Sequence, residues 1–159
     1  MNIWVVSPNV KDDGDIRYWL NRTKNEKKVF VNYEPSTKHG TVFYKNIQKG
    51  DIVVIAHGAS DNRKVYFAGM ISSVAQSNDY DGAHFRLLDS FCYSKELSDN
   101  GIKLDSTNAF GASRNPGTIY QLHHSTKSDH NIIEKLKKLM DIKRKNEKRL
   151  EILKYKKQI

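Results

Sequence analysis

The chain has 159 residues, a formal net charge of +9, 38% hydrophobic residues and one cysteine. This length predicts a single domain, and the absence of a long apolar run excludes a membrane-spanning helix. The lone Cys92 excludes an internal disulfide, argues against a structural zinc site and fits a reducing, cytoplasmic environment.

The positive charge gathers at the C-terminal end of the chain. Residues 131–159 hold eleven Lys and Arg side chains against four acidic ones, whereas the preceding 130 residues hold sixteen against fourteen. The high isoelectric point therefore belongs to the tail, and it does not by itself indicate nucleic-acid binding.

The first half of the chain predicts paired strands with a helix between the first two. The apolar spacing of Ile16, Trp19 and Leu20 predicts that helix. An apolar run bounded by turn residues, which then returns across a polar loop, predicts a central hairpin. The expected elements are strands at 3–6, 29–33, 51–57 and 65–75 and a short helix at 41–47.

The second half predicts a long bent strand over residues 84–93, an irregular segment over 94–111 and a last strand over 118–124. A helix begins near Asp129, with Thr126 as a loose capping partner. Its core-packed part should end near Ile142, because residues 143–149 contain no apolar side chain. The pattern divides the chain into a folded domain, residues 1–142, and a basic helical extension or linker, residues 143–159.

This order of elements predicts an α+β fold around a mostly antiparallel, curled sheet. About six strands of this length can close into a small barrel.

No catalytic pattern is present, so neither an enzyme nor a cofactor is expected. His123 and His124 are neighbours on a predicted strand and point to opposite faces, so this pair is not expected to hold a metal ion. Cys92, between Phe91 and Tyr93, is expected to be a buried structural thiol rather than a nucleophile paired with His84.

Aromatic residues beside polar, loop-like sequence suggest a site for an unstacked nucleic-acid base, which needs ring stacking and hydrogen-bonding groups. Trp19 and Tyr33 are candidates for stacking, with burial in the core as the alternative for each. His57 ends the central strand, where binding residues are often displayed. The basic loop residues that could hold phosphates are Lys38, His39, Arg63, Lys64 and Arg114.

Three segments resemble the EVE family of the PUA-like superfamily, to which the YTH domains are related. They are the Trp-containing strand closed by Ser7 and Pro8, the Lys49-Gly50-Asp51 strand with its return strand Ala68–Ile71, and the last strand with the helix from Asp129 to Met140. The resemblance covers most of residues 1–140. After Tyr33 the chain has Pro35-Ser36-Thr37 where the eukaryotic EVE pattern has Arg-Asn-Tyr, so the identity of the base does not carry over.

The resemblance implies an EVE-like pseudo-barrel, flanked by helices, that takes a modified base into an aromatic pocket. Ser7, Pro8 and Asn9 match the loop after the first strand, and His57 matches the polar residue that ends the central strand. Tyr33 falls near a Trp position of the family pattern. Together with Trp19, these residues form the expected base pocket.

Similar domains stand at the N-terminus of McrBC-type modification-dependent restriction systems, ahead of a GTP-driven motor. The resemblance therefore implies a DNA-specificity domain for a modified base such as a methylated one, followed by a GTPase motor domain or a nuclease subunit. Two alternatives stay open. One is an RNA-binding PUA-like module, and the other is a protein-interaction domain that uses the basic C-terminal helix.

Overall fold

The computed structural model describes residues 1–8, 16–57, 64–77, 82–102, 119–125 and 127–158 of the chain. The strands are β1 (Ile3–Val6), β2 (Lys28–Val31), β3 (Ile52–His57), β4 (Lys64–Ile71), β5 (Gln76–Ser77), β6 (His84–Tyr93) and β7 (Ile119–Gln121). The helices are α1 (Ile16–Glu26), α2 (Lys38–Thr41), the π-helical η1 (Val42–Asn46), α3 (Ser94–Asp99) and α4 (Lys127–Gln158).

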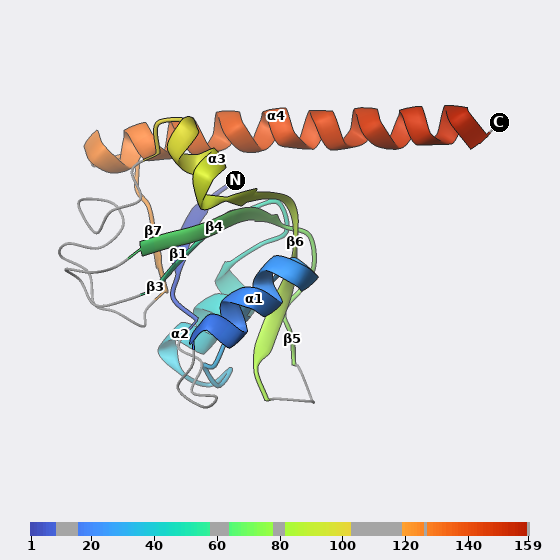
Figure 1. Ribbon diagram of the computed structural model, residues 1–159. Coiled ribbons are helices and arrows are strands. Elements are labelled where there is room, and N and C mark those ends of the chain that lie inside the picture. The colour runs from blue at the N-terminus through green and yellow to red at the C-terminus, as the bar shows by residue number, and fades with distance from the viewer. Residues whose placement is uncertain (9–15, 58–63, 78–81, 103–118, 126, 159) are drawn as a thin grey trace.

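The strands form one sheet in the order β2-β6-β4-β3-β1-β7, with β5 added on β6. All neighbouring strands are antiparallel except β1 and β3, which run parallel. The sheet is strongly curled, so that it forms a half-barrel with helices on its flanks (Figure 1). The predicted α+β class and the mostly antiparallel, curled sheet are thereby confirmed, with β1–β3 as the one parallel pair among the described strands.

The curl is concentrated in β6, whose ten residues serve two parts of the sheet. Its first half pairs with β2 and its second half with β4. Within the second half, Ser90 adopts a left-handed backbone conformation, with φ of 49°, where the β4–β6 register shifts between Ala68 and Met70. A Cβ on Gly69 would lie 3.2 Å from that of Leu88, so this close crossing favours glycine.

The curled sheet separates two hydrophobic clusters. On one face, alternate residues of β1 and β3 pack with Leu97 of α3 and Leu136 of α4. On the other face, the intervening strand residues pack with Phe43 of η1 and Tyr33. Figure 1 shows this division, with α3 and α4 above the sheet and α1 and α2 below it. Burial of both strand faces explains the continuous apolar runs in the sequence.

Most of the predicted elements are confirmed, but the strand expected over residues 65–75 ends at Ile71 and the one expected over 118–124 ends at Gln121. The short strand β5 and one helix were missed. The segment expected to be irregular begins with α3, in which Leu97 is fully buried and the Glu96 carboxylate accepts a hydrogen bond from the Tyr93 amide at 3.3 Å. One buried leucine and one capping acid are too short a pattern for helical periodicity to reveal. The helix expected over residues 41–47 begins earlier, as α2, and continues as η1.

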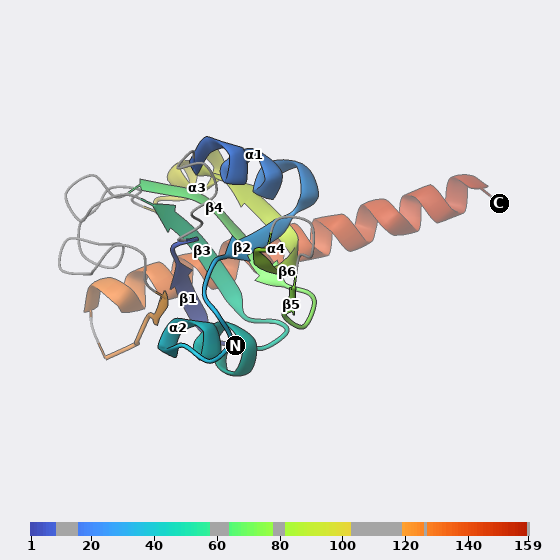
Figure 2. The ribbon, with the colours of Figure 1, turned by 90° about the horizontal axis from the view of Figure 1, so that it is seen from below.

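The long helix α4 leaves the body of the domain partway along its length. Met140 is fully buried, whereas Ile142 is 46% exposed, so the predicted end of the core-packed part is confirmed. Beyond it, Glu147 still accepts a hydrogen bond from the Ser90 amide at 3.3 Å. Figure 2 shows the C-terminal half of α4 projecting away from the sheet.

Candidate functional site

Several strand ends meet at one end of the sheet. Because β1 and β3 are parallel and Val6 pairs with Ile55, both strands end there, at Val6 and His57. Lys64 begins β4 opposite His57, and Ile119 begins β7 opposite Val6. Strand register alone thus brings together positions 6, 57, 64 and 119.

The segment after β2 and the helix α2 join the same end. The Asn32 amide donates to the Pro8 carbonyl at 3.0 Å, and the Tyr33 hydroxyl donates to the Ser7 carbonyl at 3.4 Å. The Tyr33 ring lies 5.3 Å from the His39 ring, centroid to centroid. We call the group Ser7, Pro8, Tyr33, Lys38, His39, His57 and Lys64 the strand-end site.

A tight approach of two backbones places His39. The Thr37 side chain caps α2 by accepting from the Gly40 amide at 3.1 Å and donating to the Glu34 carbonyl at 2.7 Å. A Cβ on Gly40 would lie only 1.8 Å from that carbonyl oxygen. Glycine is therefore required next to His39, because any side chain would push α2 off the preceding loop.

The strand-end site combines a buried floor with accessible side chains. Ser7 and Tyr33 are 2% and 8% exposed, so they form the floor. His39 and His57 are half-buried, while Lys38 and Lys64 are exposed. Two imidazoles and two ammonium groups are thus the side chains of this site that an external ligand can reach.

The environment of His39 sets its protonation state and its tautomer. Burial, reinforced by the Lys38 charge, lowers the pKa of His39 below its ordinary value of 6.5, so the ring is neutral near pH 7. The Ile119 amide donates to His39 Nδ1 at 3.3 Å. A neutral ring that accepts at Nδ1 carries its proton on Nε2. His39 therefore presents Nε2–H as an uncharged hydrogen-bond donor.

His57 lies on the same side of the sheet as Tyr33. Along β3, Val54 and Ala56 belong to the cluster beneath α4, whereas Val53 and Ile55 belong to the cluster that contains Tyr33. Because side chains alternate along a strand, His57 follows Ile55 to the Tyr33 side.

Trp19 is placed elsewhere, in a small cluster that α1 forms on β2. It is 2% exposed and packs on Phe30, with the ring centroids 5.3 Å apart, and on Ala83. Arg22 lies over its ring at 5.4 Å from the centroid. Its Nε1 is buried and has no hydrogen-bond partner among the residues described. The fold thus gathers seven of the eight described candidates and leaves Trp19 apart.

Three further candidates, Asn9, Arg63 and Arg114, lie outside the described residues. Sequence reasoning missed the role of Asn32 and Ile119, whose backbone amides tie the strand ends together. Backbone bonding of this kind leaves no residue-type signal.

Cys92 is confirmed as a buried thiol. It is fully buried between β4 and α4, and burial raises its pKa to about 12. Its Sγ donates to the Ser90 carbonyl at 3.8 Å, while His84 bonds instead to the Tyr44 hydroxyl at 2.6 Å. A thiol held in its neutral form is not an effective nucleophile at neutral pH.

A second concave surface lies on the other side of η1. This pocket of about 380 Å³ is lined by Tyr44, Lys45, Ile47, Gln48, Lys49, Val74 and Arg86. Arg86 is 3% exposed, and its guanidinium donates to the carbonyls of Phe43, Ser73 and Tyr44 at 2.9, 3.3 and 3.2 Å. Its hydrogen-bonding capacity is thus directed to the fold rather than to a ligand.

Within the described part of the chain, no helix has both the length and the apolar character needed to cross a membrane. No protein-family model matches this sequence, and the search of curated proteins finds no match.

Proposed function

We propose that this protein binds nucleic acid and reads a modified base at the strand-end site, as a DNA-specificity domain of the EVE-like kind. The single observation that supports the proposal most strongly is the gathering of Ser7, Pro8, Tyr33, His39 and His57. These residues come from separate parts of the sequence and share one end of the curled sheet.

The chemistry of the reachable groups suits the edge and face of a base. The neutral His39 offers an N–H donor, and its ring, which lies against the buried ring of Tyr33, offers an aromatic face. Base stacking on such rings contributes about 1–3 kcal/mol per base. His57 adds a second imidazole on the same side of the sheet. The neutral His39 would then recognise the edge of a base by an uncharged hydrogen bond. Such a bond distinguishes one base from another, and its strength does not depend on salt concentration.

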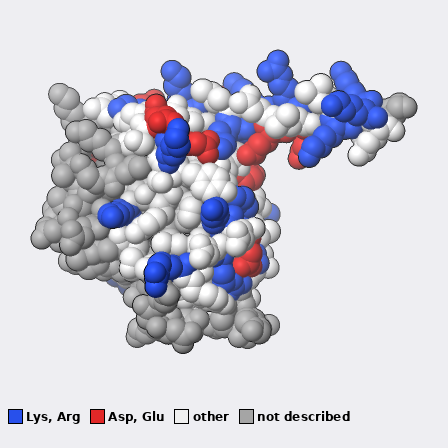
Figure 3. All heavy atoms as spheres, in the orientation of Figure 1, with Lys and Arg blue, Asp and Glu red and all other residues white. Residues whose placement is uncertain are grey.

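Phosphate contacts would come from exposed lysines. Lys38 and Lys64 flank the strand-end site. Figure 3 shows further Lys and Arg side chains spread along the projecting part of α4. Contacts of this type supply affinity but no sequence information, and they weaken as salt displaces them. Binding should therefore fall steeply with ionic strength, whereas the preference for one base over another should persist.

The experiment is fluorescence anisotropy with labelled DNA duplexes and hairpins that carry adenine, N6-methyladenine, cytosine or 5-methylcytosine at one position. RNA hairpins of the same sequence separate the RNA-binding alternative. We expect preference for a modified DNA, loss of that preference in His39→Gln and His57→Gln, and a general loss of affinity in Lys38→Gln/Lys64→Gln. The control is Lys95→Gln, since Lys95 is exposed and lies on α3, away from the site.

Equal affinity for modified and unmodified duplexes would remove base reading from the proposal. Stronger binding of the RNA hairpins would replace DNA by RNA as the target. No binding of any probe at low salt would refute the proposal as a whole.

The uncovered end of α4 favours a second candidate function, docking of a helical protein partner. Leu150 and Leu153 are 60% and 49% exposed and lie three residues apart on one face of the helix. Their exposure on a charged helix is unfavourable unless another apolar surface covers them. A Leu150→Ser/Leu153→Ser variant that loses self-association in sedimentation experiments, yet binds nucleic acid normally, would support this function. If the wild type and the variant both sedimented as monomers, self-association through α4 would be refuted.

A further inference from the structure

The link between β7 and α4 brings together three metal-ligating side chains. His124 follows β7, while His130 and Glu134 lie four residues apart on α4, and one ligand atom from each lies within 4.8 Å of the others. The Nδ1 atoms of His124 and His130 are 3.0 Å apart. All three side chains are exposed, so neither core packing nor burial accounts for their convergence.

From this cluster we infer a binding site for a divalent transition-metal ion of the Zn²⁺ class. Two imidazole nitrogens on one tetrahedral Zn²⁺, each at about 2.0–2.1 Å, stand about 3.3 Å apart, which is close to the observed Nδ1 separation. The exposed Glu134 carboxylate has the rotamer freedom to reach the same point. Two histidines and one carboxylate are an established ligand set for zinc with one coordination position left open.

The donor atoms select the class of ion. Two of the three ligands are imidazoles, which suit Zn²⁺, Co²⁺, Ni²⁺ and Cu²⁺. Ca²⁺ and Mg²⁺ prefer sites built from oxygen ligands, so they are disfavoured here. The alternative to a metal site is a simple hydrogen bond between the two Nδ1 atoms, which would involve neither Glu134 nor a metal ion.

The backbone holds the ligands in place before an ion arrives. Leu122 is 3% exposed, and its amide donates to the Ile3 carbonyl at 2.9 Å. The next amide, that of His123, donates to the buried Asp129 carboxylate at 3.1 Å. Asp129 is thus a positioning residue, because it ties the segment carrying His124 to the first turn of the helix carrying His130. Preorganised ligands lose little conformational entropy on binding.

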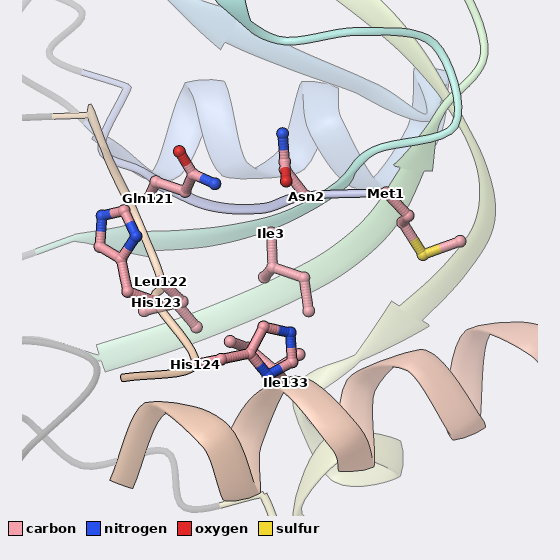
Figure 4. A pocket seen from close by; sticks show the side chains of 8 residues that line it. All are labelled: Met1, Asn2, Ile3, Gln121, Leu122, His123, His124 and Ile133. Atoms are coloured by element: carbon pink, nitrogen blue, oxygen red, sulfur yellow. The ribbon is translucent and has the colours of Figure 1, made fainter. Parts of the chain in front are cut away.

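His124 also lines a small pocket. Figure 4 shows His123 and His124 beside the start of β1, where Met1, Asn2, Ile3, Gln121, Leu122 and Ile133 complete the lining of a pocket of about 80 Å³. A water molecule is expected at the open position. The ion would join β7 to the start of α4, so it should stabilise the folded chain as any ligand of the native state does.

The test uses the full chain without a purification tag, stripped of metal with a chelator. Titration calorimetry with ZnCl₂ should show one saturable site, and Co²⁺ should give the visible absorption of tetrahedral coordination. His124→Gln, His130→Gln and Glu134→Gln should each weaken Zn²⁺ binding by at least about tenfold, because loss of an outer partner alone costs about 10–100-fold. His123→Gln is the matched control, since it removes a neighbouring exposed histidine that is not among the three ligands.

Unfolding temperatures distinguish a variant that has lost a metal-binding side chain from one whose fold is damaged. Without metal, the His130→Gln variant should unfold at the wild-type temperature, because the side chain is exposed. With Zn²⁺, the wild type and His123→Gln should gain stability, and His130→Gln should not. The inference would be overturned if the wild type bound no Zn²⁺ saturably, or if the three ligand variants bound Zn²⁺ as tightly as the wild type. It would also be overturned if His123→Gln lost as much Zn²⁺ affinity as the ligand variants.

Discussion

Removing the Asp51 carboxylate should destabilise the protein strongly, because this side chain joins three segments at the end of the sheet opposite the strand-end site. Asp51 is 4% exposed. One carboxylate oxygen accepts from the Asn2 amide at 2.9 Å, and the other accepts from Trp4 Nε1 at 3.0 Å and the Gln48 amide at 2.9 Å. The three bonds hold the starts of β1 and β3 in register, since Ile3 pairs with Ile52.

The loss of stability depends on whether water can replace Asp51 as the acceptor for each of the three donors. In Asp51→Ala, the buried Trp4 Nε1 is left without an acceptor, at a cost of about 2 kcal/mol, and the two part-buried amides add about 0.5–1 kcal/mol each. The expected loss is therefore about 3–4 kcal/mol. Asp51→Asn keeps one acceptor oxygen for Trp4 and Gln48 and loses mainly the Asn2 bond, so its expected loss is about 1–2 kcal/mol.

Urea denaturation followed by circular dichroism measures both free energies of unfolding. Asp99→Asn is the control, because Asp99 is 62% exposed and pairs with Lys95 on the surface, where such a change costs at most about 0.5 kcal/mol. If Asp51→Ala lost less than about 1 kcal/mol, or no more than Asp51→Asn, the account of Asp51 as the common acceptor would be wrong.

Four further predictions test the packing and electrostatics. Arg86→Met should lower the free energy of unfolding by about 2–4 kcal/mol in urea titrations, because three carbonyls lose a charged donor. Cys92 should resist a thiol reagent in the native state and react on unfolding, since burial raises its pKa to about 12. His39 has a lowered pKa in the folded chain, so the unfolded chain takes up a proton first as the pH falls. The free energy of unfolding should therefore decrease as the pH drops below about 6.5. In urea midpoints measured between pH 7.5 and 5, His39→Gln should make this decrease smaller. Trp19→Phe should cost less than a typical large-to-small core change, about 2 kcal/mol or less by thermal unfolding, because its Nε1 donates to none of the described residues.

The hairpin around His57 shows what sequence patterns predict well. Five apolar residues between turn signals, Ile52 to Ala56, predicted β3, and the aromatic return segment predicted β4; both strands pair as expected. The helix α3 could not be predicted in the same way, because its short polar sequence has one buried leucine and no helical periodicity. Local patterns therefore predict elements whose apolar residues are numerous and regularly spaced.

The gathering of Ser7, Tyr33 and His57 at one end of the sheet was predicted through the family resemblance. The placement of His57 beside the end of β1 depends on the parallel β1–β3 pairing, a long-range register that no local pattern contains. Trp19 and Tyr33 had the same two interpretations from sequence, and the fold buries both of them in the core. They differ in location: Trp19 packs within its own cluster, whereas Tyr33 bonds to Ser7 and its ring lies next to that of His39.

The metal-ligating cluster escaped sequence reasoning for a similar reason. The sequence predicts His123 and His124 on a strand, but β7 ends at Gln121, before both histidines. His124 lies near His130 and Glu134 because α4 begins shortly after it. The four-residue spacing of His130 and Glu134 was the available signal in the sequence.

The central claim is that a nucleic-acid base docks at the strand-end site. Two-dimensional amide NMR of the full chain, titrated with the best-binding modified oligonucleotide from the anisotropy panel, tests it most directly. The account predicts the largest shift changes at the amides of Ser7, Tyr33, His39 and His57, with smaller changes at Lys64. Shift changes confined to the projecting residues 143–158 of α4, or none in the strand-end site at saturation, would contradict it.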